Sequence, residues 1–202
     1  QQPFTVYPHF ETTNKSFLNM HSFLKHKGIK NNKFMLALLD PDLAGINPFD
    51  PHLNFMMKQK ILVECQRNYW YFLRECVRIP TSGATGGGTK FELHRGNLAF
   101  NFCSSLNLNV FLELPRQQYK TVSALCRFLY LFNFGTTNSE ISFLHTQMKN
   151  SKENLATFKS LRDSLPIYLR MDQQFTRDGK KIKAADRVET LVHPFANNRI
   201  NT

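Results

Sequence analysis

Lys120 and Thr121 open a segment of helical periodicity, directly after a polar break at residues 115–119. A short apolar run of strand length, 109–113, precedes that break. A strand, a tight polar loop and a helix that opens on Lys-Thr form a nucleotide phosphate site, because loop amides and the positive helix end face the phosphates. In this interpretation Lys120 neutralises the β- and γ-phosphates of ATP, and the Thr121 hydroxyl binds Mg²⁺.

The match to a phosphate loop is partial. Of the four fixed positions in G-x-x-x-x-G-K-[ST], only the last two are met, since Leu114 and Tyr119 replace the glycines. If the position before the lysine requires a positive φ, the tyrosine there costs about 1 to 2 kcal/mol. The alternative interpretation is an ordinary exposed Lys-Thr pair at the start of a helix.

Alternating strands and helices surround this segment. We expect strands at 109–113 and 141–144, helices at 120–134 and from 150 or 151 to 165, and further strands at 188–192 and 199–202. Gly135 is placed to end the first helix, and Asn150 with Glu153 predicts a capping box for the second. A β-α-β-α order calls for a parallel sheet with right-handed crossovers, so the predicted class is α/β.

The first half of the chain reads as mainly helical. Helices are expected at 15–26, 51–66, 69–77 and 98–106, the last of them buried. The proline-rich residues 40–51 predict a loop or hinge, which divides the chain into an arm with a helical extension, 1–50, and a main domain, 51–202. The glycine-rich residues 81–90 predict a surface connection, because no strand is expected before them and the threonine precedes the lysine.

Composition restricts the class of partner. The 202 residues are 42% hydrophobic and carry a net charge of +11, which is typical of a globular protein that meets a polyanion. No apolar run reaches 18 residues and no leader is expected, so we predict neither a membrane span nor a signal peptide. The four cysteines form no C-x-x-C and predict reduced, buried thiols, and the seven histidines lack metal-binding spacing.

Four stretches resemble one protein family. LPRQQYKTVSA is similar to the variant phosphate loop, R-Q-x-G-K-[ST], of the large terminase subunits of tailed bacteriophages. The other stretches agree in order and spacing: NYWYFLRECVRI with FELHRGNLAF, SEISFLHTQ with NSKENLATFKSLRDSLPIYL, and VETLVHPFANNRINT. The resemblance covers about residues 55–202.

The resemblance implies a fold and a set of site residues. The fold would be a RecA-like P-loop NTPase sheet flanked by helices, behind an N-terminal helical segment. Arg116 matches the loop arginine that contacts the γ-phosphate, and Asn97 stands where the family has an adenine-reading glutamine. The remaining loop positions, which would shape the ATP site, are Pro115, Gln117, Gln118 and Tyr119. The alternatives are a solvated charge for Arg116 and a helix cap for Asn97.

The resemblance also implies a function. The family uses ATP and Mg²⁺ to drive double-stranded viral DNA through the portal protein into the capsid, as a ring of copies in the host cytoplasm, with a small terminase subunit as a further partner. The acidic strand, the catalytic glutamate and the nuclease domain are expected beyond Thr202, so we expect this part alone to hydrolyse little ATP. The alternatives are a helicase-like DNA translocase and a non-catalytic, basic virion-associated protein.

Overall fold

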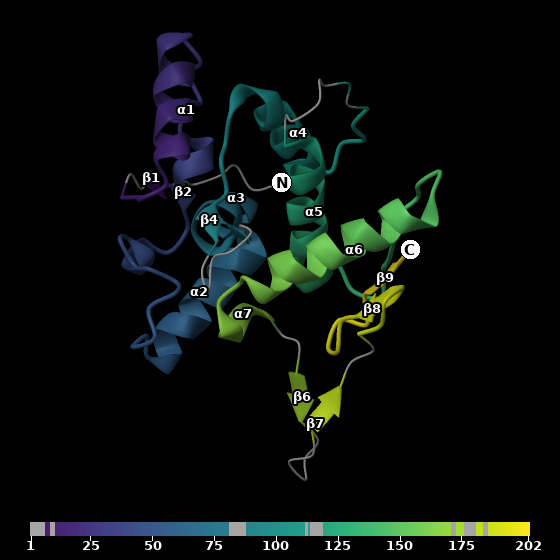
Figure 1. The fold of residues 1–202 in the computed structure, drawn as a ribbon. Coiled ribbons are helices and arrows are strands. Elements are labelled where there is room, and N and C mark those ends of the chain that lie inside the picture. The colour runs from purple at the N-terminus through teal and green to yellow at the C-terminus, as the bar shows by residue number, and fades with distance from the viewer. Residues whose placement is uncertain are drawn as a thin grey trace. The chain divides into compact units, whose positions relative to one another are not determined.

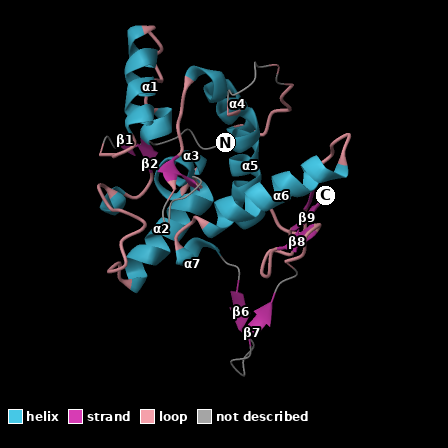
Figure 2. Ribbon diagram, in the orientation of Figure 1, coloured by secondary structure: helices cyan, strands magenta, loops and turns pink. Residues whose placement is uncertain are grey.

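The computed structural model describes residues 7–8, 11–80, 88–111, 113, 119–170, 173–175, 181–183 and 186–202 (Figure 1). The chain divides into two compact units, Gln1–Ser123 and Ala124–Thr202. Helices predominate and the strands are short (Figure 2). The predicted mixed α/β class is confirmed at this level, and the proline-rich residues 40–51 lie inside the first unit.

The first unit is built mainly of helices. Its α-helices are α1 (Lys15–His26), α2 (Phe55–Arg67), α3 (Tyr69–Tyr71), α4 (Arg95–Ser105) and the start of α5 (Lys120–Tyr130). Shorter turns are the 3-10 helices η1 (Phe34–Leu36) and η2 (Pro41–Leu43) and the π-helix η3 (Phe72–Cys76). Two antiparallel strand pairs complete it: β1 (Tyr7–Pro8) with β2 (Ala37–Leu38), and β3 (Arg78–Ile79) with β4 (Thr89–Lys90).

The predicted helices of this unit form, with local differences. α2 begins at Phe55 and not at residue 51 as expected, because Asn54 caps it, accepting a hydrogen bond from the Met57 amide at 2.8 Å. α4 forms, but its buried side chains are the polar Asn97 and Asn101 and not an apolar face.

A buried carboxylate ties the core of the first unit together. Glu64, only 2% exposed, accepts hydrogen bonds from the Leu39 amide at 2.9 Å and the Asp40 amide at 3.0 Å. The Asn68 side chain donates to the same carboxylate at 2.7 Å and also caps α3 by accepting from the Tyr71 amide. Helix α2, the chain after β2 and helix α3 are therefore fixed to one another through one charged group.

The second unit contains a three-stranded sheet and two further helices. After α5 come the π-helix η4 (Leu131–Gly135), α6 (Met148–Asp163) and α7 (Ile167–Arg170). The sheet has the order β5 (Glu140–Ser142), β9 (Arg199–Asn201), β8 (Thr190–Val192), and a separate hairpin pairs β6 (Gln173–Phe175) with β7 (Lys181–Lys183). β5 and β9 run parallel, and the connection between them contains α6.

Two details of the predicted second half are wrong. The segment expected to form a strand at 109–113 has no strand at its described residues 109–111 and 113, and Phe111 is 96% exposed. A short apolar run becomes a buried strand only where a neighbouring strand and a covering layer exist, and none of the strands that the structure describes pairs with residues 109–111 or 113. α6 begins at Met148 after Gln147, without a side-chain cap, so the Asn150–Glu153 capping box does not start it.

The thiol prediction agrees with the structure in most respects. All four cysteines are free, and Cys65, Cys76 and Cys126 are buried, whereas Cys103 is half-buried. Burial raises the pKa of the Cys65 and Cys126 thiols, which keeps them protonated.

The second unit contains a buried histidine. His193, 2% exposed, accepts hydrogen bonds at Nδ1 from the amides of Phe195 at 3.1 Å and Ala196 at 3.0 Å, and its ring packs against Phe132. Burial lowers the pKa of the imidazole from 6.5 to about 4. The folded chain therefore holds His193 neutral at pH values where the unfolded chain would protonate it.

Replacing Glu64 with alanine should destabilise the chain by on the order of 3 kcal/mol, because it leaves buried amides and the Asn68 side chain without their acceptor. Urea unfolding followed by circular dichroism measures this loss. Glu153→Ala, at an exposed position of α6, is the matched control and should change the unfolding free energy by less than about 0.5 kcal/mol. Equal effects of the two variants would contradict the role given to Glu64.

Acid should weaken the second unit through His193. Because the folded pKa lies below the unfolded one, the stabilisation is complete above pH 6.5 and is lost as pH falls from 6.5 towards 4, up to about 3 kcal/mol. His193→Asn keeps an acceptor for the two amides and removes the titration. Unfolding free energies measured across this range should fall more steeply for the parent than for the variant, and parallel curves would contradict the assignment.

Candidate functional site

The start of α5 presents Lys120 and Thr121 at a helix N-terminus, as the sequence predicts. Lys120 is the first helical residue, Thr121 is the second, and both are exposed. The Tyr119 carbonyl accepts a hydrogen bond from the Ser123 amide at 2.8 Å and closes the first turn. The first amides of an α-helix have no acceptor within the helix and carry its positive dipole end, so the Lys-Thr pair lies where an anion is favoured.

Tyr119, directly before this pair, has a left-handed backbone. Its φ is +52°, in the region that favours glycine, and this is the position where a phosphate loop has its second glycine. The other described non-glycine residues with positive φ are Asn107, Asn138 and Asn197, and asparagine tolerates this conformation better than tyrosine. The chain therefore holds a bulky residue in a conformation that costs about 1 to 2 kcal/mol.

A ring contact joins Tyr119 to the start of α4. The Tyr119 ring meets the His94 ring edge-on, with 5.5 Å between the centroids. His94 is the N-cap of α4, and its Nδ1 accepts a hydrogen bond from the Gly96 amide at 3.1 Å. The structure thus places the predicted loop end beside the segment that the resemblance assigns to adenine, and His94 is a residue that the sequence analysis did not single out.

Asn97 acts as a helix cap in this structure. Its Oδ1 accepts a hydrogen bond from the His94 amide at 2.9 Å, its Nδ2 donates to the Glu92 carbonyl at 2.9 Å, and the residue is 1% exposed. The capping alternative is the one that the geometry supports. An adenine-reading role would require the amide to leave these partners.

The other predicted loop residues lie outside the described part of the chain. They are Pro115, Arg116, Gln117 and Gln118. Among the described residues no cluster of three His, Cys, Asp or Glu side chains forms a metal site. Mg²⁺ commonly uses one or two protein oxygens together with substrate phosphates, so an exposed hydroxyl such as that of Thr121 fits this mode of binding.

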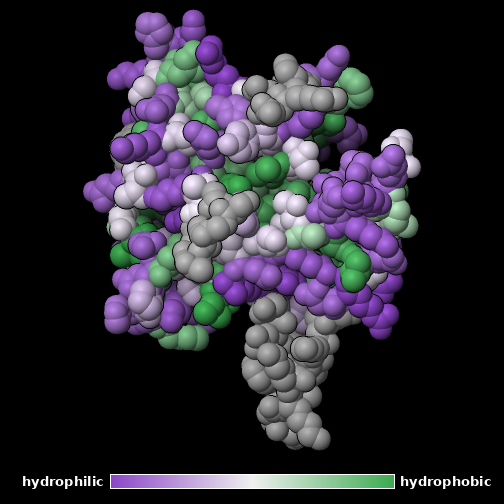
Figure 3. Space-filling view, in the orientation of Figure 1, coloured by the Kyte–Doolittle hydropathy of each residue, from purple (hydrophilic) through white to green (hydrophobic). Residues whose placement is uncertain are grey.

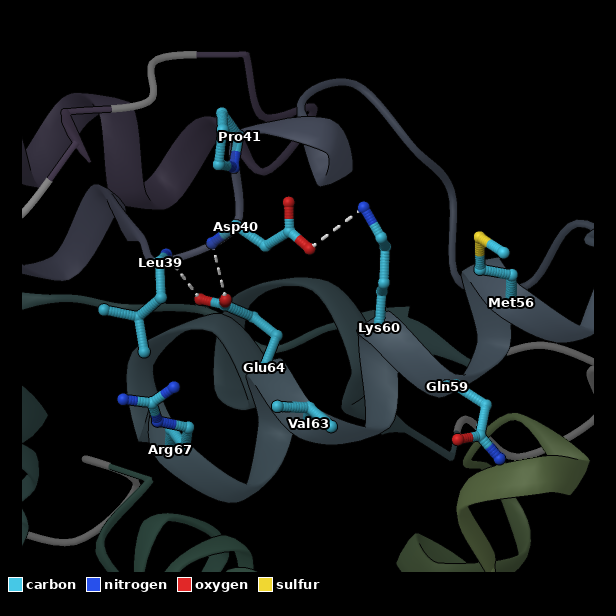
Figure 4. Close-up of a pocket in the computed structure, with 9 residues that line it drawn as sticks. All are labelled: Leu39, Asp40, Pro41, Met56, Gln59, Lys60, Val63, Glu64 and Arg67. Carbon is cyan, nitrogen blue, oxygen red and sulfur yellow. Dashed lines mark hydrogen bonds and ion pairs between the residues drawn. The ribbon is translucent and has the colours of Figure 1, made fainter.

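A pocket of about 440 Å³ lies along α2 (Figure 4). Glu64 points from the helix to the amides of Leu39 and Asp40, and Lys60 pairs with Asp40 at 3.4 Å and also with Asp42. The hydrogen bond with Asp42 leads the effects that raise the pKa of Lys60. Lys60 and Glu64, the charged groups that α2 presents to this pocket, are therefore already paired within the first unit.

Comparisons with known proteins do not assign the chain to a family. No protein-family model matches the chain, and no curated protein is significantly similar to it. None of the helices in the described ranges combines the length and apolar character that a membrane crossing requires. The features of the chain that bear on function are the start of α5 and the positive net charge.

The left-handed backbone at residue 119 gives a stability prediction. Tyr119→Gly and Tyr119→Ala both remove the ring contact with His94, and they differ in the cost of the positive φ. We expect the glycine variant to be more stable than the alanine variant by about 1 kcal/mol, measured by thermal unfolding. An alanine variant of equal or greater stability would show that residue 119 does not need this conformation.

Proposed function

We propose that the chain belongs to an ATP-driven motor that packages double-stranded DNA, as do the large terminase subunits that it resembles. The observation that carries the nucleotide part of this proposal is the left-handed Tyr119 directly before Lys120 and Thr121 at the start of α5. A lysine and a hydroxyl residue that follow a left-handed residue into a helix match one part of a phosphate loop, the start of its helix. The contact of Tyr119 with His94 adds the second segment of the proposed site.

In the proposed site, positively charged groups bind the phosphates of ATP. The ammonium group of Lys120 would neutralise the β- and γ-phosphates of ATP, and the helix amides would bind the same oxygens. Thr121 would hold Mg²⁺, which when bound neutralises charge that develops on the transferred phosphoryl group. Arg116 would contribute a further cation to the γ-phosphate.

The DNA part of the proposal is supported by the charge of the chain and by the resemblance. Residues 1–101 have 12 basic and 7 acidic side chains, and residues 102–202 have 14 and 8, so the excess of positive charge extends along the chain. Hydrophilic side chains predominate around α1 on the face shown in Figure 3, and Lys15 and Lys25 of that helix are exposed. An excess of this kind favours duplex DNA through its phosphates, without base readout.

A non-catalytic function is the second candidate. It is favoured by the tyrosine in place of glycine at position 119 and by the absence of a strand at residues 109–111 and 113. A loop that has lost its glycine and its preceding strand would bind ATP weakly. The two candidates therefore differ in nucleotide affinity.

Lys120→Ala is the test. If the site binds MgATP, loss of the ammonium group should weaken the affinity at least about tenfold, because charge-assisted hydrogen bonds contribute about 1.5 to 3 kcal/mol. Titration of a fluorescent ATP analogue measures the affinity. Lys149→Ala, at an exposed lysine on α6, is the matched control and should bind as the parent does. Equal affinity of parent and Lys120→Ala would reject the site, and a parent that does not bind would favour the non-catalytic candidate.

A further inference from the structure

A second pocket of the first unit, of about 360 Å³, is lined by two basic side chains from one strand pair. Arg78 in β3 and Lys90 in β4 are direct partners in the antiparallel register. The opposite walls come from the segment before α1 and from the loop after η2, with these lining residues: Glu11, Thr12, Thr13, Gly45, Ile46, Asn47 and Pro48. Every residue of this pocket lies within the described part of the chain.

The guanidinium group of Arg78 is held in a fixed position. It stacks over the Phe49 ring at 4.2 Å from the centroid. Its Nη1 donates hydrogen bonds to the carbonyls of Glu75 and Val77, both at 2.9 Å. A planar guanidinium fixed in this way loses little rotational freedom when it binds an oxyanion.

Lys90 lies close enough to Arg78 for the two positive charges to interact. Its ammonium group donates a hydrogen bond to Thr13 Oγ1. Burial lowers the pKa of Lys90, the positive charge of Arg78 lowers it further, and the charge of Glu75 raises it in part. Two cations that the fold brings together against their repulsion are stabilised by an anion bound near both.

Two carboxylates, Glu75 and Glu11, also line the pocket. Glu75 accepts a hydrogen bond from Nε of buried Arg74 at 2.7 Å. Glu11 lies beside Gly45, where an added Cβ would be 3.1 Å from its Oε2. Arg74 is buried and does not line the pocket, but its ion pair with Glu75 partly offsets the charge of that carboxylate, which favours an oxyanion over a cation between Arg78 and Lys90.

We propose that this pocket binds a phosphate group between Arg78 and Lys90, with the hydroxyl groups of Thr12 and Thr13 as further donors. The phosphate group can be a free phosphate or one that belongs to a DNA backbone. The proposal stands apart from the ATP site at the start of α5, because it uses other residues and needs no nucleotide hydrolysis.

The test is a calorimetric titration of the whole chain with inorganic phosphate at low salt, in the Lys120→Ala background so that binding at the α5 start does not contribute. Lys90→Met should weaken phosphate binding at least about tenfold. Lys149→Met, which removes the same charge from an exposed position on α6, should leave the affinity unchanged. Equal losses in the two variants, or no phosphate binding by the parent, would overturn the proposal.

Glu11→Gln is a second variant, and its expected effect is a gain in phosphate affinity, which a misfolded variant would not show. It removes a negative charge from an exposed residue of the pocket wall and should tighten phosphate binding several-fold. Unchanged or weaker binding would count against an anion in this pocket. Thermal unfolding checks that all variants are folded.

A short DNA duplex distinguishes the two sources of the phosphate group. If the pocket contacts the backbone, Lys90→Met should reduce the slope of log affinity against log salt by about 1 more than Lys149→Met does. Loss of phosphate binding with an unchanged duplex slope assigns the pocket to a small phosphate compound. If Lys120→Ala did not change the affinity for ATP, the proposed ATP site would be rejected. The proposal for this pocket would not be affected, because it uses other residues.

Discussion

The need to satisfy the buried carboxylate of Glu64 constrains the first unit. A charge removed from water must be hydrogen-bonded, and here two backbone amides and the amide of Asn68 meet that need. Asn68 in turn starts α3, which continues into η3. The carbonyl of Arg74 in η3 and that of Phe91 both accept hydrogen bonds from the side chain of Asn14, so the same set of contacts reaches the segment that leads to α4. This series of polar contacts thus leads to the segment that carries His94, whose ring contacts Tyr119.

Buried asparagines have a similar role in the two units. Each unit contains a π-helical turn, η3 or η4, closed by a hydrogen bond from an amide five residues on: Val77 to Phe72 at 3.1 Å, and Thr136 to Leu131 at 3.1 Å. Asn14 donates to a carbonyl of η3, and Asn198 donates to the Phe132 carbonyl of η4 at 2.8 Å. Amide side chains satisfy carbonyls that a widened turn leaves without a regular helical partner.

Local signals in the sequence predict the helices better than the sheets. The helix at 15–26 and the cap at Asn68 follow from residue spacing and capping chemistry, which act within one or two turns. The strand expected at 109–113 depends on a partner strand, which local sequence does not specify. The sequence allowed a capping role for Asn97. It could not predict the partners of the side chain, the amide of His94 and the carbonyl of Glu92.

The site was partly predictable for the same reason. The start of α5 at Lys120 follows from periodicity, and the exposure of Lys120 and Thr121 agrees with it. The contact between His94 and Tyr119 joins segments 25 positions apart, and no spacing rule connects them. The pairing of Arg78 with Lys90 depends on the register of a hairpin that the sequence analysis interpreted as a loop.

The two π-helical turns also bear on how related chains should align with this one. A π-turn accommodates one residue more than an α-turn, so its removal restores ordinary helical geometry without changing the helix before it. A deletion of one residue within Leu131–Gly135 would therefore turn the π-turn into an α-turn at the end of α5. The buried side chain of Asn133 would then change its position. Insertions and deletions between homologues should concentrate at these turns, which makes them natural breakpoints when an alignment is built.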